Sequence, residues 1–215
     1  MDIKVIIADD HAIIREGLKS LLEKQNISVI GIAQNGREAV DLAIDLEPDI
    51  VMMDISMPDL NGMEATSRIK KEIPDTRVIA LSMHSTKKFI DDMFVAGASA
   101  YILKECAFKE LYQAIQEVIK GNFYLSPAIA RTYVESHMAN PEDTYTPVFK
   151  QMTEKEREVL QLIAEGAKTK DIADALHVST KTIETHRRNI MKKLNIYSIA
   201  GLTKYAIKEG IISLD

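Results

Sequence analysis

The stretch DIVMMDISMPDLNG, residues 49–62, predicts the fold of this chain more strongly than any other segment. It begins with a continuous apolar run, ends that run at Asp54, and continues into a turn that contains proline and glycine. A short continuous apolar run is typical of a parallel strand that is covered on both faces. An acidic residue at the end of such a strand lies at the edge of the sheet where α/β proteins bind ligands.

Similar runs recur before and after this stretch. Residues 3–8, 28–33, 77–81 and 100–103 are short, apolar and rich in β-branched residues. Between the runs, apolar residues recur at the spacing of amphipathic helices. Five strands that alternate with five helices predict a doubly wound α/β fold with a five-stranded parallel sheet and right-handed crossovers.

The last 65 residues predict a different, all-α domain. Thr153 has the capping-box spacing to Glu156 and begins a first helix that ends near Gly166. Further helices are expected from Lys170, after Ser179 and over about 198–208. We therefore expect one domain over 1–121, a linker with one helix over 122–147, and a small four-helix domain over 148–215. Within this linker, Pro127 begins a helix that ends near His137, and 139–146 is a polar stretch.

Composition excludes several classes of protein. The chain has 215 residues, of which 46% are hydrophobic and 27% charged, as in ordinary globular proteins. No apolar run approaches the ~20 residues of a membrane span, and the first one is too short for a signal peptide. The single cysteine, Cys106, cannot form an internal disulfide or a metal site with several cysteines. We expect a cytoplasmic protein that does not bind membranes.

The net charge of −5 is distributed unevenly. Residues 1–124 contain 14 basic and 20 acidic residues, whereas residues 151–215 contain 11 basic and 9 acidic residues. An acidic first half and a basic second half suggest two domains with different partners.

Chemically active residues follow four of the expected strands. Asp9 and Asp10 follow the first strand, Asp54 the third, Ser82 the fourth and Lys104 the fifth. Parallel strands place these residues at one edge of the sheet. Carboxylate oxygens in one cleft favour Mg²⁺, and an Asp can attack phosphorus to form an aspartyl-phosphate. We interpret Asp54 as the nucleophile and the other two acids as metal ligands.

The segments VIIADDH (5–11), DIVMMDISMPDLNG (49–62), VIALSMH (78–84) and GASAYILKE (97–105) together resemble the receiver domain of two-component response regulators. The resemblance covers about residues 1–120 and implies a flavodoxin-like strand order. Many receivers have proline after the lysine, where this chain has Glu105, so the geometry of the Lys104–Glu105 bond stays open. The resemblance implies that Asp54 is the phospho-acceptor and that Mg²⁺ is bound by Asp9, Asp10, Asp54 and the Ser56 carbonyl. It also implies that Lys104 and Ser82 contact the phosphoryl group and that Tyr101 is the switch residue.

A basic helix marks the C-terminal domain. Residues 177–195 contain five Lys or Arg and one acid, while Ile183, Ile190 and Leu194 form the apolar face. A short helix, a tight turn and a basic helix describe a helix-turn-helix, whose second helix enters the major groove. The string from Thr153 to Ile196 resembles the LuxR/NarL type. It implies base contacts by Glu184, Thr185 and Arg188, and phosphate contacts by Lys170, Lys181, Thr182, His186, Arg187 and Lys192.

Both resemblances together describe a DNA-binding transcriptional response regulator of the NarL/FixJ type. A sensor histidine kinase would phosphorylate Asp54, and a phosphorylated homodimer would bind a double-stranded DNA operator. We expect no enzymatic activity beyond self-catalysed phosphorylation and dephosphorylation. One alternative is an Asp-nucleophile phosphatase, but such enzymes have a second Asp where this chain has Ser56. Another is a module that dimerises without phosphorylation.

The charge asymmetry also predicts how the two domains interact. We expect the acidic receiver to dock on the basic helix and mask it until phosphorylation. Alternatively, the receiver masks nothing, and phosphorylation acts only by dimerising two half-site readers.

Overall fold

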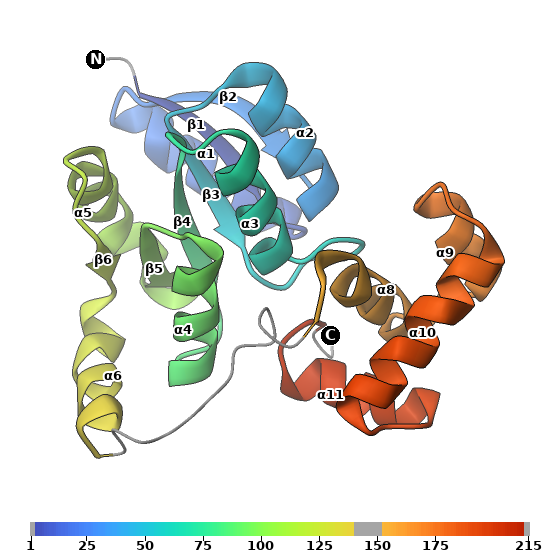
Figure 1. The fold of residues 1–215 in the computed structure, drawn as a ribbon. Coiled ribbons are helices and arrows are strands. Elements are labelled where there is room, and N and C mark those ends of the chain that lie inside the picture. The colour runs from blue at the N-terminus through green and yellow to red at the C-terminus, as the bar shows by residue number, and fades with distance from the viewer. Residues whose placement is uncertain (1–2, 140–151, 213–215) are drawn as a thin grey trace.

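The structure, a computed structural model, describes residues 3–139 and 152–212 (Figure 1). The N-terminal domain contains a sheet with helices on both faces, and the C-terminal domain contains helices. Most of the polar stretch predicted over 139–146 lies outside the described residues. Within the described ranges, no helix has the length and apolar character needed to cross a membrane.

The sheet is entirely parallel, in the order β2-β1-β3-β4-β5-β6. The doubly wound fold predicted from the sequence is therefore confirmed. The sequence analysis missed the sixth strand, which has two residues and pairs with β5. The strands are β1 Lys4–Ala8, β2 Ser28–Ala33, β3 Ile50–Asp54, β4 Arg77–Ser82, β5 Ala100–Leu103 and β6 Tyr124–Leu125.

Helices cover the two faces of the sheet. Alternate residues along β1 point to opposite faces, so Val5 and Ile7 pack against α1 and α5 while Ile6 and Ala8 pack against α2 and α3. Helix α4 packs with α6 over the far end of the second face. The helices are α1 Ala12–Lys24, α2 Gly36–Leu46, α3 Gly62–Glu72, α4 Lys87–Ala96, α5 Ala107–Ile119 (after the 3₁₀ turn Lys104–Cys106) and α6 Pro127–Ala139.

The C-terminal domain has the four predicted helices around its own core. Thr153 and Glu156 form the expected capping box at the start of the first one. Ile183 and Ile190 of the third helix are buried in this core, as the apolar face of the basic helix requires. The helices are α8 Glu154–Ala164, α9 Thr169–Ala175, α10 Thr180–Leu194 and α11 Ile199–Lys208.

The backbone approaches itself closely behind Asp54. The Gly62 N–H donates to the Ile55 carbonyl at 2.9 Å, and a Cβ atom at Gly62 would lie 1.9 Å from the Asp54 carbonyl oxygen. Only a residue without a Cβ atom allows helix α3 to begin so close to the end of β3. The loop 55–61 is thereby held tightly beside the acidic residues.

We expect Gly62→Ala to destabilise the N-terminal domain by about 1–3 kcal/mol, because β3 and α3 must move apart. Urea unfolding followed by circular dichroism measures the change. Ser67→Ala, a partly exposed position on the same helix, is the control and should change the free energy of unfolding by less than about 0.5 kcal/mol. Equal stabilities of the two variants would contradict the importance of this close approach.

Candidate functional site

Acidic side chains from two neighbouring strands meet at the carboxyl edge of the sheet. The register pairs Ala8 of β1 with Met53 of β3, so Asp9 and Asp54 follow adjacent positions. Both side chains are buried. Ligand atoms of Asp9, Asp10, His11 and Asp54 all lie within 4.8 Å of one another. The structure therefore brings together the acids that the sequence predicted to share a site.

The ammonium group of Lys104 lies between two of these carboxylates. Its Nζ atom is 2.9 Å from Asp9 Oδ2 and 2.8 Å from Asp54 Oδ2. Burial raises the pKa of Asp54 to about 7; Lys104 opposes this rise and the Asp9 charge adds to it. Burial alone would lower the pKa of Lys104, but the two carboxylates outweigh it and raise that pKa. The site therefore combines one cation with an excess of negative charge.

The acidic residues have the composition of a magnesium site. Three carboxylates converge, and the oxygen atoms they offer are the donors that Mg²⁺ prefers. Their combined negative charge exceeds that of Lys104, so a divalent cation would relieve the remaining repulsion. The residues present therefore fit this ion.

His11 is a member of the cluster to which the sequence analysis gave no role. Its Nδ1 atom is 2.7 Å from Asp10 Oδ1, and its backbone N–H donates to Asp9 Oδ1 at 2.8 Å. It also occupies the N-cap position of α1 without a side-chain cap bond. Its position directly after the acidic pair was the only signal in the sequence.

Ser82 and Tyr101 are linked through the β4–α4 loop. The His84 N–H donates to Ser82 Oγ at 2.9 Å, and the Tyr101 hydroxyl donates to the His84 carbonyl at 2.8 Å. Tyr101 is completely buried. The resemblance implies that Tyr101 is a switch residue, and in this structure its side chain already lies inside the domain. The aromatic ring fits the apolar cluster of α4, β5 and α6, which explains its position.

Residues after the strand ends complete the local geometry. The Ser56 N–H donates to Asp54 Oδ1 at 3.3 Å, which orients the carboxylate. The peptide bond between Lys104 and Glu105 is trans. The sequence left the geometry of this bond open, because Glu105 stands where many receivers have proline.

The acidic site opens into a cleft of about 620 Å³ that both domains line. Asp54, Ser56 and Lys104 contribute from the N-terminal domain, and Ile207 and Ile212 from the C-terminal domain. Sequence analysis missed these two isoleucines, because an apolar residue of a distant segment carries no signal that it faces the acidic site.

Helix α8 attaches the C-terminal domain to the loop that follows Asp54. Gln161 accepts hydrogen bonds from the Asn61 backbone N–H at 2.9 Å and from Asn61 Nδ2 at 3.0 Å. The same amide donates to the Met57 carbonyl at 3.1 Å. Gln161 and Asn61 are both buried. A direct hydrogen-bonded connection thus joins the acidic site to α8.

Apart from Glu64–Arg157, the ion pairs between the domains in the described residues run opposite to our expectation. Arg68 of α3 lies 2.9 Å from Glu154 and 3.1 Å from Glu158, and Arg37 lies 2.5 Å from Glu158. At these pairs the N-terminal domain contributes cations to acidic residues of α8, so the predicted docking of an acidic N-terminal domain on the basic helix is wrong. Net charge averages over a whole domain, whereas docking depends on the few charges at the contact. Two more pairs join the domains, Glu64–Arg157 at 2.7 Å and Lys88–Glu209 at 2.5 Å.

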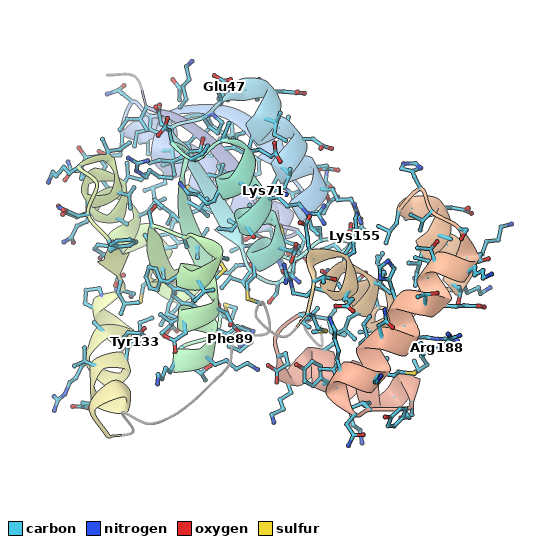
Figure 2. The ribbon with its side chains drawn as sticks, in the orientation of Figure 1. Glu47, Lys71, Phe89, Tyr133, Lys155 and Arg188 are labelled. Carbon is cyan, nitrogen blue, oxygen red and sulfur yellow. The ribbon has the colours of Figure 1, made fainter. Side chains whose placement is uncertain are left out.

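The basic helix α10 lies on the far side of α8 from the sheet (Figure 1). Figure 2 shows Arg188 on the side of α10 that points away from the N-terminal domain. The residues predicted to read bases, Glu184, Thr185 and Arg188, are exposed. Among the predicted phosphate contacts, Lys181 and Lys192 are exposed and Thr182, His186 and Arg187 are partly exposed, while Lys170 lies in the first turn of α9.

Comparisons with known proteins match both halves of the chain. The family described as "Response regulator receiver domain" matches residues 5–116, and "Bacterial regulatory proteins, luxR family" matches residues 150–206. The transcriptional regulatory protein MctR of Rhizobium johnstonii is 36% identical over 212 residues, which cover 98% of this chain and 96% of MctR. The oxygen regulatory protein NreC of Staphylococcus carnosus is 36% identical over 215 residues, which cover 97% and 99% of the two chains.

Solved structures show the same relationship. A LuxR-family response regulator from Aurantimonas is 34% identical, with a TM-score of 0.62 over 64% of this chain and 99% of that one. RcsB from Salmonella enterica serovar Typhimurium, solved on promoter DNA with a phosphomimetic, is 27% identical, with a TM-score of 0.62 over 95% and 98% of the two chains. The matched domains, their order and the converging carboxylates lead to one conclusion: this chain belongs to the two-component response regulators that carry a LuxR-type DNA-binding domain.

Proposed function

We propose that Asp54 is the residue through which this phosphorylation-switched transcriptional regulator receives its signal. The observation that carries the proposal is the pairing of Lys104 with both Asp9 and Asp54 at one edge of the sheet. Asp54 is the candidate nucleophile, since its carboxylate lines the cleft while Asp9 is fully buried. Asp9, Asp10, Asp54 and the Ser56 carbonyl would hold Mg²⁺, which neutralises phosphoryl charge when bound.

The residues of the cleft can perform phosphoryl transfer from a sensor histidine kinase. An Asp54 carboxylate oxygen attacks the phosphorus atom, the phosphorus–nitrogen bond of the donor phosphohistidine breaks, and its electron pair stays on the imidazole. Lys104, which otherwise pairs with carboxylates alone, then also pairs with a phosphoryl oxygen. Ser82 would exchange its bond from His84 for one to the phosphoryl group.

The output of the switch is DNA binding by α10. We place the receiver at 1–121, the linker at 122–147 and the DNA-binding domain at 148–215. Exposed Glu184, Thr185 and Arg188 would read base edges of a double-stranded operator, and the surrounding basic residues would contact phosphates. A phosphorylated homodimer would place two such helices on paired half-sites.

The family is one of regulators, which argues against the phosphatase alternative. Ser56 also stands two residues after Asp54, at the position where such phosphatases have their second Asp. The receiver itself would catalyse only the gain and loss of its own phosphoryl group.

Acetyl phosphate with Mg²⁺ should label wild-type protein at Asp54, because the carboxylate faces an accessible cleft. Asp54→Asn should remove the label, and mass spectrometry of the intact protein measures it. Asp59→Asn, the same change at an exposed position five residues away, is the control and should keep full labelling. An acid-stable, alkali-labile phosphate that persists in Asp54→Asn would disprove the assignment.

Arg188→Ala and Lys192→Ala should weaken DNA binding in different ways, although both side chains are exposed on α10. Arg188→Ala should relax the preference at one base pair, at a cost of about 1–3 kcal/mol. Lys192→Ala should weaken all sequences alike and reduce the slope of log K against log salt by roughly 0.9. Titrations at several salt concentrations, with operator and scrambled DNA, measure both effects. Identical behaviour of the two variants would contradict the division into base and phosphate contacts.

The position of α10 changes the expectation for masking. Because its base-reading residues are exposed while the domains are docked, wild-type protein should bind a single half-site about as tightly as an undocked variant. Gln161→Ala supplies that variant, since it removes the acceptor for Asn61. Fluorescence anisotropy with a half-site duplex measures both affinities. A more than fivefold tighter complex of Gln161→Ala would show that docking hinders DNA binding.

A further inference from the structure

Part of the wall of the phospho-acceptor cleft comes from the DNA-binding domain. Ile207 of α11 and Ile212 after it line the same space of about 620 Å³ as Asp54 and Lys104. Ile14 and Met83 continue the apolar wall on the receiver side. The reactive carboxylate thus lies in a cleft whose size depends on where the C-terminal domain sits.

The end of α11 is held against the receiver by specific contacts. Lys88 Nζ lies 2.5 Å from Glu209 Oε2 and donates to the Lys208 carbonyl at 2.9 Å. Gly210 adopts a positive φ of 69°, and a Cβ atom there would lie 2.0 Å from the Phe89 ring. Figure 2 shows Phe89 on α4. These contacts lie between Ile207 and Ile212 in the sequence, so they hold both wall residues in place.

The β4–α4 loop connects this contact to the phosphoryl-sensing hydroxyl. The His84 ring stacks on Phe89 with ring centroids 4.1 Å apart, and the His84 N–H donates to Ser82 Oγ. His84 also lines the cleft. The receiver residues that hold α11 are therefore packed directly against the residues around the phospho-acceptor.

Size limits which donors can enter this cleft. A helix with its side chains is about 10–12 Å wide. Such a donor can bring a phosphohistidine to Asp54 only by approaching the wall that Ile207 and Ile212 form. Acetyl phosphate consists of only a few heavy atoms, so the cleft admits it.

We propose that the docked DNA-binding domain makes Asp54 selective for the size of the phosphodonor, with Ile207 and Ile212 as the residues that exclude a phosphohistidine carried on a helix. Small acyl phosphates react in the docked arrangement, and a helical phosphohistidine donor reacts only after α11 has moved away. The proposal rests on the proposed role of Asp54 and adds a specificity rule to it.

The chemistry is the same for both donors. An Asp54 oxygen forms the new oxygen–phosphorus bond in each case. With acetyl phosphate, the acyl oxygen–phosphorus bond breaks and acetate leaves; with phosphohistidine, the phosphorus–nitrogen bond breaks and the imidazole takes up a proton. Selectivity therefore comes from access rather than from a different reaction.

Labelling of the full-length protein with two donors tests the proposal. The donors are acetyl phosphate and a 20-residue helical peptide with one phosphohistidine, each supplied with Mg²⁺. Phosphate on the protein is followed over time by mass spectrometry. Lys88→Glu and Glu209→Lys each break the contact at the end of α11, and the double variant Lys88→Glu/Glu209→Lys restores an ion pair. Gln161→Ala releases the domains at a separate contact, and Ile207→Ala widens the wall without changing either contact.

Each single variant should accelerate labelling by the peptide between roughly 5- and 150-fold, the usual range of coupling between two sites. Labelling by acetyl phosphate should stay within about twofold. The double variant should return part of the way to the wild-type ratio of the two rates, because it restores the ion pair but not the hydrogen bond from Lys88 to the Lys208 carbonyl. Thermal unfolding checks that each variant is folded. If the peptide labels wild type as fast as the single variants, or labels none of them, the proposal is wrong. Failure of acetyl phosphate to label wild type at Asp54 would instead contradict the proposed function.

Discussion

Two buried carboxylates, Asp9 and Asp54, share the ammonium group of Lys104, and the N-terminal fold is arranged around this contact. An unpaired buried charge costs several kcal/mol, so each strand end must deliver its residue to within bonding distance of the others. Parallel pairing of β1, β3, β4 and β5 does this, since it collects their carboxyl ends at one edge. Gly62 then allows α3 to begin directly behind the site.

The loop between β3 and α3 has two sets of partners. On one side, the Ser56 N–H orients the Asp54 carboxylate. On the other side, Gln161 binds Met57 and Asn61 through three hydrogen bonds inside a buried contact. Losing one partner would leave buried donors and acceptors unsatisfied at about 1–3 kcal/mol each. A rearrangement of this loop would therefore change the docking of the C-terminal domain directly.

Sequence patterns predicted those features that depend on local chemistry or on a domain's own core. Apolar runs gave the five longer strands, and parallel topology placed Asp54 beside Asp9. Strand β6 was missed because two residues show no periodicity. Docking was predicted wrongly for a related reason. Glu158 and Gln161 of α8 look solvent-facing in sequence, yet both are buried against the receiver, and hydrophobic periodicity reports only the core of the helix's own domain.

Docking leaves residues of α10 exposed and covers the end of α11, so the contacts between the domains lie at the cleft beside Asp54 and along α8 rather than at the exposed side of α10. Linkage then constrains the switch in both directions. If a phosphoryl group on Asp54 weakens docking by some factor, docking weakens binding of that group by the same factor. In the proposed function, the contacts of the phosphoryl group with Lys104 and Ser82 would supply the free energy that separates the two domains. In this proposal the switch needs no strained element, because only a donor on a helix requires Ile207 and Ile212 to move away from the cleft.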